Sequence, residues 1–232
     1  MNDFFFYFSY IQFMQFFFPD REQIKADYAE TARYLGYRKV SPPQSDVQKL
    51  IVSCCDEMHS VLMPKSVFEI FPLKVGGEKL DSGDGDLNTN ADTTISNRIS
   101  FADLSFESVD LSRNLDGCSQ VAIFAATLGP QVDALIRRYE RIDTVKAAIL
   151  QSVGAMFAEV LVGQVNDEIK KIAAASGKKC KPRYSPGYGD VPLQFQKEFF
   201  RLLPCTKIGL TLMDTLIMSP EKSVTAFVGI FD

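Results

Sequence analysis

Residues Asp143–Ala174 read DTVKAAILQSVGAMFAEVLVGQVNDEIKKIAA. This stretch has the pattern of one long helix, for which Asp143 is a suitable N-cap because its carboxylate can accept a hydrogen bond from the first turn. At 1.5 Å of rise per residue, a helix from Thr144 to about Ala174 would be about 45 Å long. A helix of this length is expected to form the backbone of its domain.

Strand patterns lie on both sides of this helix in the sequence. Residues Gln120–Thr127 are apolar through their middle, which is typical of a strand covered on both faces. Other stretches alternate or are rich in strand formers: Phe68–Val75, Ile99–Phe106 as a strand or pair of strands, Gly209–Leu212 and Ser223–Ile230. Because strands and helices follow one another in no regular order, the sequence predicts an α+β domain.

Shorter helices are predicted from the same kind of reasoning. Ser45 is expected to cap one of them and Asp190 another. The predicted helices are Asp20–Tyr37, Ser45 to about Met63, a helix that begins at Pro130, and Pro192–Leu203. The first has Ile24, Tyr28, Ala32 and Leu35 near one face. The helix from Pro130 has Val132, Leu135, Ile136 and Tyr139 on one face.

Composition excludes several classes of function. The net charge of -4 argues against a nucleic-acid partner, because such proteins usually carry a basic face. An odd number of cysteines, five, favours reduced thiols and a cytoplasmic protein over a disulfide framework. His59 is the single histidine, so a zinc site with two histidines is excluded and acid–base hydrolysis is disfavoured. We expect His59 on a helix surface or boundary and no bound metal.

Two segments are interpreted as additions to the domain, which we place at residues 20–232. Residues 1–19 form an aromatic extension that would pack on the surface or stay disordered. As a helix, Phe4–Phe18 would span only about 22 Å, too short for a bilayer, so membrane association is disfavoured and a peripheral anchor is the alternative. Asp81–Asp86 is acidic and rich in glycine, but its spacing does not fit a calcium loop, so an exposed hairpin or insertion is expected.

Glu159 is the first candidate for a ligand-binding residue. Its helical neighbours three and four residues away are apolar or small, namely Ala155, Met156, Val162 and Gly163. A carboxylate on such a face loses hydration and needs a cation, a donor or a ligand. The alternative is a boundary glutamate whose tip reaches water.

The second feature is the segment Arg183–Pro192, which reads RYSPGYGDVP. Its glycines and prolines disfavour a helix and predict a stiff loop. Such a loop can present main-chain groups and tyrosine walls to a planar ligand, while Arg183 can hold a carboxylate. Loops of this composition are also common without a ligand.

The loop resembles a known ligand site. Arg183-x-x-x-Gly187-Tyr188 is similar to the Arg-x-x-x-Gly-Tyr loop of the S-adenosylmethionine-binding activation domain of cobalamin-dependent methionine synthase. The long helix with its Ala158-Glu159 pair and the closing run from Gly209 through Met218-x-Pro220 to Ser223-Val224 also resemble this family. Residues Tyr34–Tyr37 and Phe71–Leu73 resemble the front half of its free-standing members.

The resemblance implies a fold and a set of ligand residues. The fold is a twisted, mainly antiparallel sheet packed with a long central helix and several shorter helices. Arg183 would bind the methionine carboxylate, Glu159 would help to hold the ligand, Ser185 and Gly187 would contact it through the main chain, and Tyr188 would form part of the wall. The sequence departs from the family where Gly177 stands in place of a second ligand glutamate.

By the same resemblance, the chain would be one component of a methyltransferase system rather than a complete enzyme. It would bind S-adenosylmethionine and support reductive remethylation of cobalamin on a separate methionine synthase or other corrinoid protein, with a flavodoxin-type reductant. The basic run Lys178–Arg183 could guide an acidic partner, or it is an ordinary solvated cluster. The alternatives are a docking module that no longer binds S-adenosylmethionine and, more weakly, an independent methyltransferase.

Overall fold

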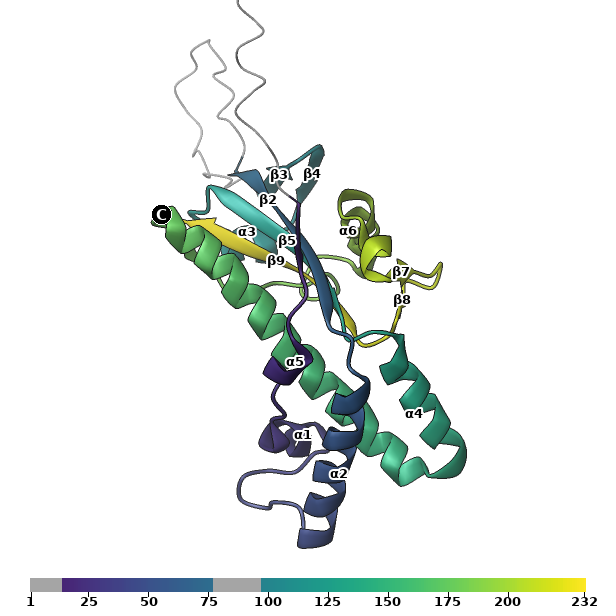
Figure 1. Ribbon diagram of the computed structural model, residues 1–232. Helices are drawn as coiled ribbons and strands as arrows, with labels where there is room; N and C mark the ends of the chain where they lie inside the picture. Colours follow the sequence, from purple (N-terminus) through teal and green to yellow (C-terminus); the bar gives the residue numbers. More distant parts are fainter. Residues whose placement is uncertain (1–13, 77–96) are drawn as a thin grey trace, which may run out of the picture.

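One antiparallel sheet organises the molecule (Figure 1). The computed structural model describes residues 14–76 and 97–232. Its main sheet has the strand order β4-β3-β2-β5-β9-β6, with β1 paired to β2 beside this path. The strands are β1 Gln15–Phe17, β2 Lys65–Val75, β3 Arg98–Phe101, β4 Leu104–Glu107, β5 Gln120–Thr127, β6 Lys179–Cys180 and β9 Ser223–Phe231.

The long helix α5 covers one face of this sheet and extends beyond it (Figure 1). It runs over Thr144–Ala175, and the Asp143 side chain accepts from the N–H of Lys146 at 2.9 Å, so both the helix and its cap are confirmed. Its projecting half packs against α1 Tyr28–Tyr34, α2 Ser45–Val61 and α4 Pro130–Ile142. By length and composition α5 could cross a membrane, yet 56% of its apolar window is buried against the rest of the protein, as in a core helix.

The central strand β5 joins two hydrophobic cores. Ala122, Phe124 and Ala126 belong to the core beneath α5, whereas the intervening residues belong to a core on the opposite face. This second core is closed by α3 Val109–Asn114, by α6 Gln196–Leu202 and by the 3-10 helix Cys205–Ile208. The predicted burial of both faces of β5 is therefore confirmed, as is the α+β class.

Two predicted helices differ from the structure at their beginnings. The range Asp20–Tyr37 contains a 3-10 helix, Arg21–Gln23, and then α1 from Tyr28. The break arises because Asp27 accepts from the N–H of Glu30 and thereby caps a new helix. At α2 the N-cap is Gln44, without a side-chain hydrogen bond, so the prediction that Ser45 caps this helix is wrong.

The role predicted for Asp190 is also wrong. Its carboxylate accepts from the Ser108 hydroxyl and from the N–H groups of Val109 and Asp110, so it binds the start of α3. The segment that Asp190 was expected to cap begins with a 3-10 helix, Leu193–Phe195, and α6 follows directly. The N-cap of α3 is Ser108, whose hydroxyl oxygen accepts from the N–H of Leu111 at 3.0 Å. Asp190 adds acceptors for further groups at this helix start from a distant part of the chain, which local sequence does not show.

The remaining predictions concern the strands and single residues. The strand patterns are confirmed at β2, β5 and β9, and Ile99–Phe106 forms the pair β3 and β4. The predicted strand Gly209–Leu212 is shorter than expected, because Gly209 ends a 3-10 helix. Residues 211–212 and 218–219 form a small separate sheet, β7 Thr211–Leu212 and β8 Met218–Ser219. Residues 1–13 and the acidic segment 81–86 lie outside the described residues, whereas residues 15–17 of the predicted extension form β1.

His59 and the cysteines fit the predictions for them. His59 is half-buried at the end of α2, and its Nε2 lies 3.0 Å from the carbonyl oxygen of Arg21. All five cysteines are free thiols, and burial raises the pKa of Cys54 to about 11 and that of Cys205 to about 12. No cluster of potential metal ligands occurs among the described residues.

Candidate functional site

A cavity of about 640 Å³ opens where strand β9 forms an uncovered edge. β6 pairs only with the end of β9, at Ile230 and Phe231, so the first residues of β9 face the loop that follows β6. α5 and this loop provide the other walls, and α6 contributes one side chain. The lining residues are Glu159, Asn166, Pro182, Arg183, Tyr184, Ser185, Pro186, Tyr188, Gln196, Met218, Ser223, Val224 and Thr225.

The sheet fixes the position of Arg183. Its neighbour Tyr184 exchanges two main-chain hydrogen bonds with Phe227, at 2.9 and 2.7 Å, and the N–H of Lys181 donates to the carbonyl oxygen of Gly229. Arg183 is therefore held between two points of contact with β9. Its guanidinium reaches across the cavity to α5.

Arg183 and Glu159 form an ion pair in the cavity. The Nη2 group of Arg183 donates to Oε2 of Glu159, and their side chains are 34% and 43% exposed. Glu159 thus finds a cation within the chain, and its exposure also agrees with the alternative of a boundary glutamate whose tip reaches water. A guanidinium carries five N–H donors, so Arg183 can hold a second carboxylate while it contacts Glu159.

The loop between Arg183 and Val191 is held by its own hydrogen bonds. The N–H of Gly187, at a φ of 92°, donates to the carbonyl oxygen of Val191 at 2.8 Å. The Tyr184 hydroxyl donates to the carbonyl oxygen of Tyr188 at 2.8 Å. Burial, followed by the nearby charges of Asp110 and Asp190, raises the pKa of Tyr184, which favours the neutral hydroxyl. Residues 183–191 form no helix, as predicted, and the stiffness of the loop stays a prediction.

The five predicted ligand residues are brought to one region, but not all of them line the cavity. Glu159, Arg183, Ser185 and Tyr188 do, with Tyr188 69% exposed at the rim. Gly187 is not among the lining residues, and its N–H is already bonded to Val191. Its main-chain contact to a ligand stays a prediction.

The edge of β9 adds main-chain groups that the sequence did not indicate. Alternate residues of an antiparallel strand direct their N–H and C=O groups to opposite sides. Phe227 and Gly229 bond outward, toward the loop, so Thr225 directs its main-chain groups to the same side, where it lines the cavity. This position offers one donor and one acceptor to a planar ligand.

Asn166 and Gln196 also line the cavity and were missed by the sequence analysis. A signal existed for Asn166, because it lies seven residues, or two helical turns, after Glu159 and therefore on the same face of α5. No local pattern singled out Gln196. Its place in the cavity depends on how α6 packs beneath the sheet.

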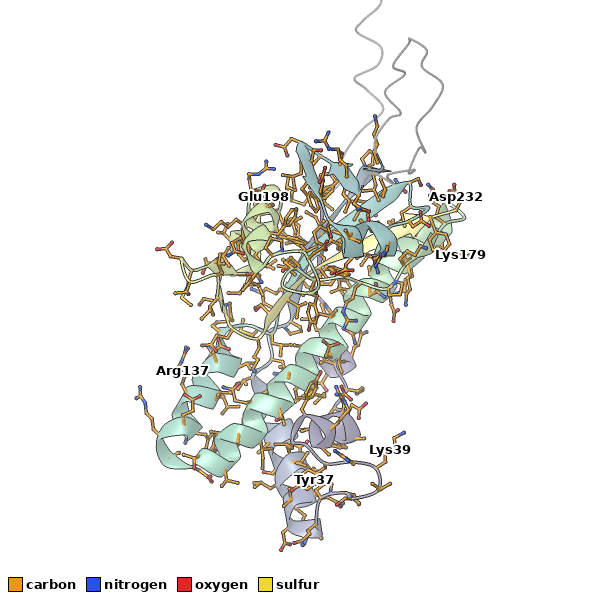
Figure 2. The ribbon with its side chains drawn as sticks, turned by 180° about the vertical axis from the view of Figure 1, so that it is seen from behind. Tyr37, Lys39, Arg137, Lys179, Glu198 and Asp232 are labelled. Atoms are coloured by element: carbon orange, nitrogen blue, oxygen red, sulfur yellow. The ribbon has the colours of Figure 1, made fainter. Side chains whose placement is uncertain are left out.

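The basic run Lys178–Arg183 is largely engaged within the protein. Lys178 pairs with Asp232 at 3.3 Å and donates to the Ser119 hydroxyl at 2.7 Å. Lys181 lies over the ring of Phe231, 5.0 Å from its centroid. Figure 2 shows Lys179 and Asp232 at this same end of the molecule. The run therefore helps to hold the end of the chain against α5 and β9, and guidance of a partner stays a prediction.

Comparison with known proteins identifies the family. The model of the family described as vitamin B12 dependent methionine synthase, activation domain, matches residues 46–230. The chain belongs to this family. Membership associates this activation domain with the vitamin B12-dependent methionine synthase machinery. No curated protein matches the chain.

A solved structure confirms the fold of the activation domain. The chain is similar to the MetH reactivation domain bound to AdoHcy, with a TM-score of 0.61 and 17% sequence identity. The match covers 93% of this chain and 78% of that one. At this identity the likeness establishes the fold, including the mainly antiparallel sheet and the long central helix that the resemblance implied.

Another cavity, of about 700 Å³, lies at the opposite end of the activation domain from the C-terminus. It is formed by α1, by residues 37–43 and by the start of α2, and most of its lining residues precede the region that the family model matches. Figure 2 shows Tyr37 and Lys39 there, remote from Lys179 and Asp232. The cavity at the β9 edge, which holds Glu159 and Arg183, is the candidate site.

Proposed function

We propose that this activation domain binds S-adenosylmethionine in the cavity at the β9 edge and supports reductive remethylation of cobalamin. The cobalamin would be carried by a separate methionine synthase or other corrinoid protein. The observation that carries the proposal is the meeting of Arg183 and Glu159 in one cavity, from a loop and from α5.

The charges of this pair are complementary to those of the ligand. The methionine part of S-adenosylmethionine carries a carboxylate, an ammonium group and a sulfonium group. Arg183 would bind the carboxylate through two parallel N–H donors, while Glu159 would lie near a positive group of the ligand. The two side chains then exchange part of their mutual contact for contacts with the ligand.

The size of the cavity agrees with a ligand of this kind. A volume of about 640 Å³ lies within the range of roughly 300–1,000 Å³ that is usual for small-molecule sites. Tyr188 at the rim and Val224 and Met218 in the wall add apolar surface. The main-chain groups of Thr225 can recognise a heterocycle in the plane of the sheet.

The chemistry requires positioning rather than acid–base catalysis. An electron from a reductant of the flavodoxin type would convert cob(II)alamin on the partner to cob(I)alamin. The cobalt would then take the methyl group as the carbon–sulfur bond breaks, giving methylcobalamin and S-adenosylhomocysteine. The residues of this chain would orient the methyl donor, which is a large catalytic effect when two reactants must meet.

A second function is favoured by a specific observation. Arg183 already pairs with Glu159, and Gly177, where the family has a second ligand glutamate, lies in the turn after α5 with a φ of 74°. A domain whose ligand charges neutralise each other could serve only as a docking module for the corrinoid protein. The affinity for S-adenosylmethionine separates the two functions.

The test is calorimetric titration of S-adenosylmethionine and S-adenosylhomocysteine into the wild type and the variants Arg183→Gln and Glu159→Gln. The matched control is Arg137→Gln, which makes the same change on the exposed face of α4, away from the cavity (Figure 2). We expect saturable binding by the wild type and the control. Each site variant should bind about tenfold or more weakly, since each removes a charged hydrogen bond to the ligand.

Loss of binding by these variants should not reflect unfolding. Ion pairs between partly exposed side chains typically contribute only about 0–1 kcal/mol to stability. Urea unfolding of both variants should therefore stay within about 1 kcal/mol of the wild type. Absence of heat from the wild type up to millimolar ligand would contradict the proposal and support the docking module.

A further inference from the structure

Gln196, the first residue of α6, presents a polar atom that the fold does not satisfy. Its side chain lines the cavity at the β9 edge, and the residue is only 7% exposed. Its Oε1 atom is buried and has no hydrogen-bond partner among the described residues. It enters the cavity from the sheet face opposite α5, because α6 packs in the core on that face.

Such an atom is costly for the fold. A buried acceptor without a donor loses its hydration and gains nothing in return, and most buried polar groups in proteins are satisfied. A methionine or leucine at this position would avoid the loss. The position of Gln196 in a cavity suggests that the missing donor belongs to a ligand.

A second amide in the same cavity has the same feature. The Oδ1 atom of Asn166, on α5, is buried without a partner among the described residues. Asn166 lies seven residues beyond Glu159, or about 10 Å farther along the helix axis. Residues with a buried, unsatisfied amide oxygen thus belong to two walls of the cavity, α5 and α6, in addition to the ion pair of Arg183 and Glu159.

We propose that Gln196 and Asn166 bind the nucleoside half of the ligand, with their amide oxygens accepting hydrogen bonds from its hydroxyl or amino groups. The proposal rests on the proposed function and adds to it a division of the cavity into two parts. Charged side chains suit the charged amino-acid end, whereas neutral amides suit the neutral donors of ribose and adenine. The ligand class is therefore an adenosine carrying an amino-acid chain on its 5′-sulfur.

The experiment compares two ligands on four proteins. S-adenosylhomocysteine has both halves, whereas methylthioadenosine keeps the nucleoside and lacks the amino acid. Calorimetric titration with each is performed on the wild type, Gln196→Met, Arg183→Gln and Gln194→Met. The last variant is the matched control, because Gln194 is exposed and lies outside the cavity, two residues from Gln196.

We expect Gln196→Met to bind both ligands about tenfold more weakly than Gln194→Met, as loss of one hydrogen bond from a buried acceptor predicts. Arg183→Gln should weaken S-adenosylhomocysteine only, because methylthioadenosine has no carboxylate. Without ligand, the melting temperature of Gln196→Met should equal or exceed that of the wild type, because an unsatisfied buried atom has been removed. A purely structural glutamine would give the opposite shift.

Asn166→Leu provides a second, independent variant on the other wall. It should also weaken both ligands, in the same proportion for each. The proposal is overturned if Gln196→Met and Asn166→Leu both bind S-adenosylhomocysteine as tightly as Gln194→Met. Failure of the proposed function gives a different result. In that case the wild type itself binds neither S-adenosylmethionine nor S-adenosylhomocysteine, and both proposals are contradicted.

Discussion

At the scale of single residues, Asp190 ties the loop of the candidate site to the body of the protein. Its carboxylate lies 2.6 Å from the N–H of Val109 and 3.3 Å from that of Asp110, and the Ser108 hydroxyl donates to it. The hydrogen bond from the Ser108 hydroxyl lowers the pKa of Asp190, and the two N–H groups lower it further, whereas slight desolvation acts in the opposite direction. One carboxylate thus holds the end of the loop against the start of α3.

We predict that Asp190→Ala lowers the free energy of unfolding by about 1 kcal/mol at neutral pH, because it removes hydrogen bonds from a charged acceptor to the start of α3. The pKa of Asp190 is lowered in the folded state, so its stabilisation is complete above the unfolded value near 3.8 and is lost as pH falls through the lower folded value. The difference between wild type and variant should therefore shrink between pH 7 and pH 3. Urea unfolding at both pH values checks this.

The matched control is Asp214→Ala, which removes an exposed aspartate from the turn between β7 and β8. This variant should change stability by less than about 0.5 kcal/mol at either pH. An Asp190→Ala effect of equal size at pH 7 and pH 3 would contradict a charge-dependent role.

At the scale of elements, the junction between β5 and α4 depends on a close approach of two backbones. Gly129 is the N-cap of α4 at a φ of 93°, and a Cβ there would lie 2.8 Å from the Cβ of Met63. The N–H of Met63 donates to the carbonyl oxygen of Leu128 at 2.9 Å, which holds the end of α2 against this junction. The entry to α4 and the end of α2 therefore constrain each other.

We predict that Gly129→Ala costs about 2–4 kcal/mol of stability, because it adds a steric clash to the strain of a backbone with φ 93° and ψ 162°, a region that is essentially restricted to glycine. Gly117→Ala is the control for strain alone: its φ is 74°, and nothing lies within 4 Å of its added Cβ. That variant should cost about 1 kcal/mol. Equal costs for the two substitutions, measured by urea unfolding, would show that the contact with Met63 relaxes freely.

At the scale of the whole molecule, the central strands make the two cores one folding unit. β5 sends alternate residues into the core beneath α5 and into the core beneath α3 and α6. Neither core can lose β5 without exposing the other. The candidate site lies at the edge of the same sheet, so its walls are held by both cores.

We predict a single calorimetric transition that is shifted by substitutions in either core. Leu150→Ala, on the buried side of α5, and Leu203→Ala, in the core on the opposite face of the sheet, each remove a buried leucine. Each should cost about 2–5 kcal/mol and lower the melting temperature by several degrees. The surface control Val145→Ala, at a residue 64% exposed, should shift the transition little. A second calorimetric peak in either leucine variant would mean that the cores unfold separately.

Features that depend on neighbours along the chain could be predicted from the amino-acid sequence. The apolar run Gln120–Thr127 predicted a strand buried on both faces, and Asp143 predicted the start of the long helix, because these features need only residues a few positions apart. The resemblance of Arg183–Tyr188 to a family motif predicted the fold and the family. Glu159 and Arg183 were each marked as site residues for separate reasons.

Contacts between residues far apart in the sequence became visible only in the folded protein. Arg183 pairs with Glu159, and Gln196 is buried in the cavity. Asp190 accepts hydrogen bonds from the start of α3, some eighty residues earlier in the chain. Local sequence patterns do not predict these contacts. The contacts arise from the register of β9 against Tyr184 and from the packing of α6 beneath the sheet. A hydrogen bond between distant residues depends on how the two segments are positioned in the folded protein.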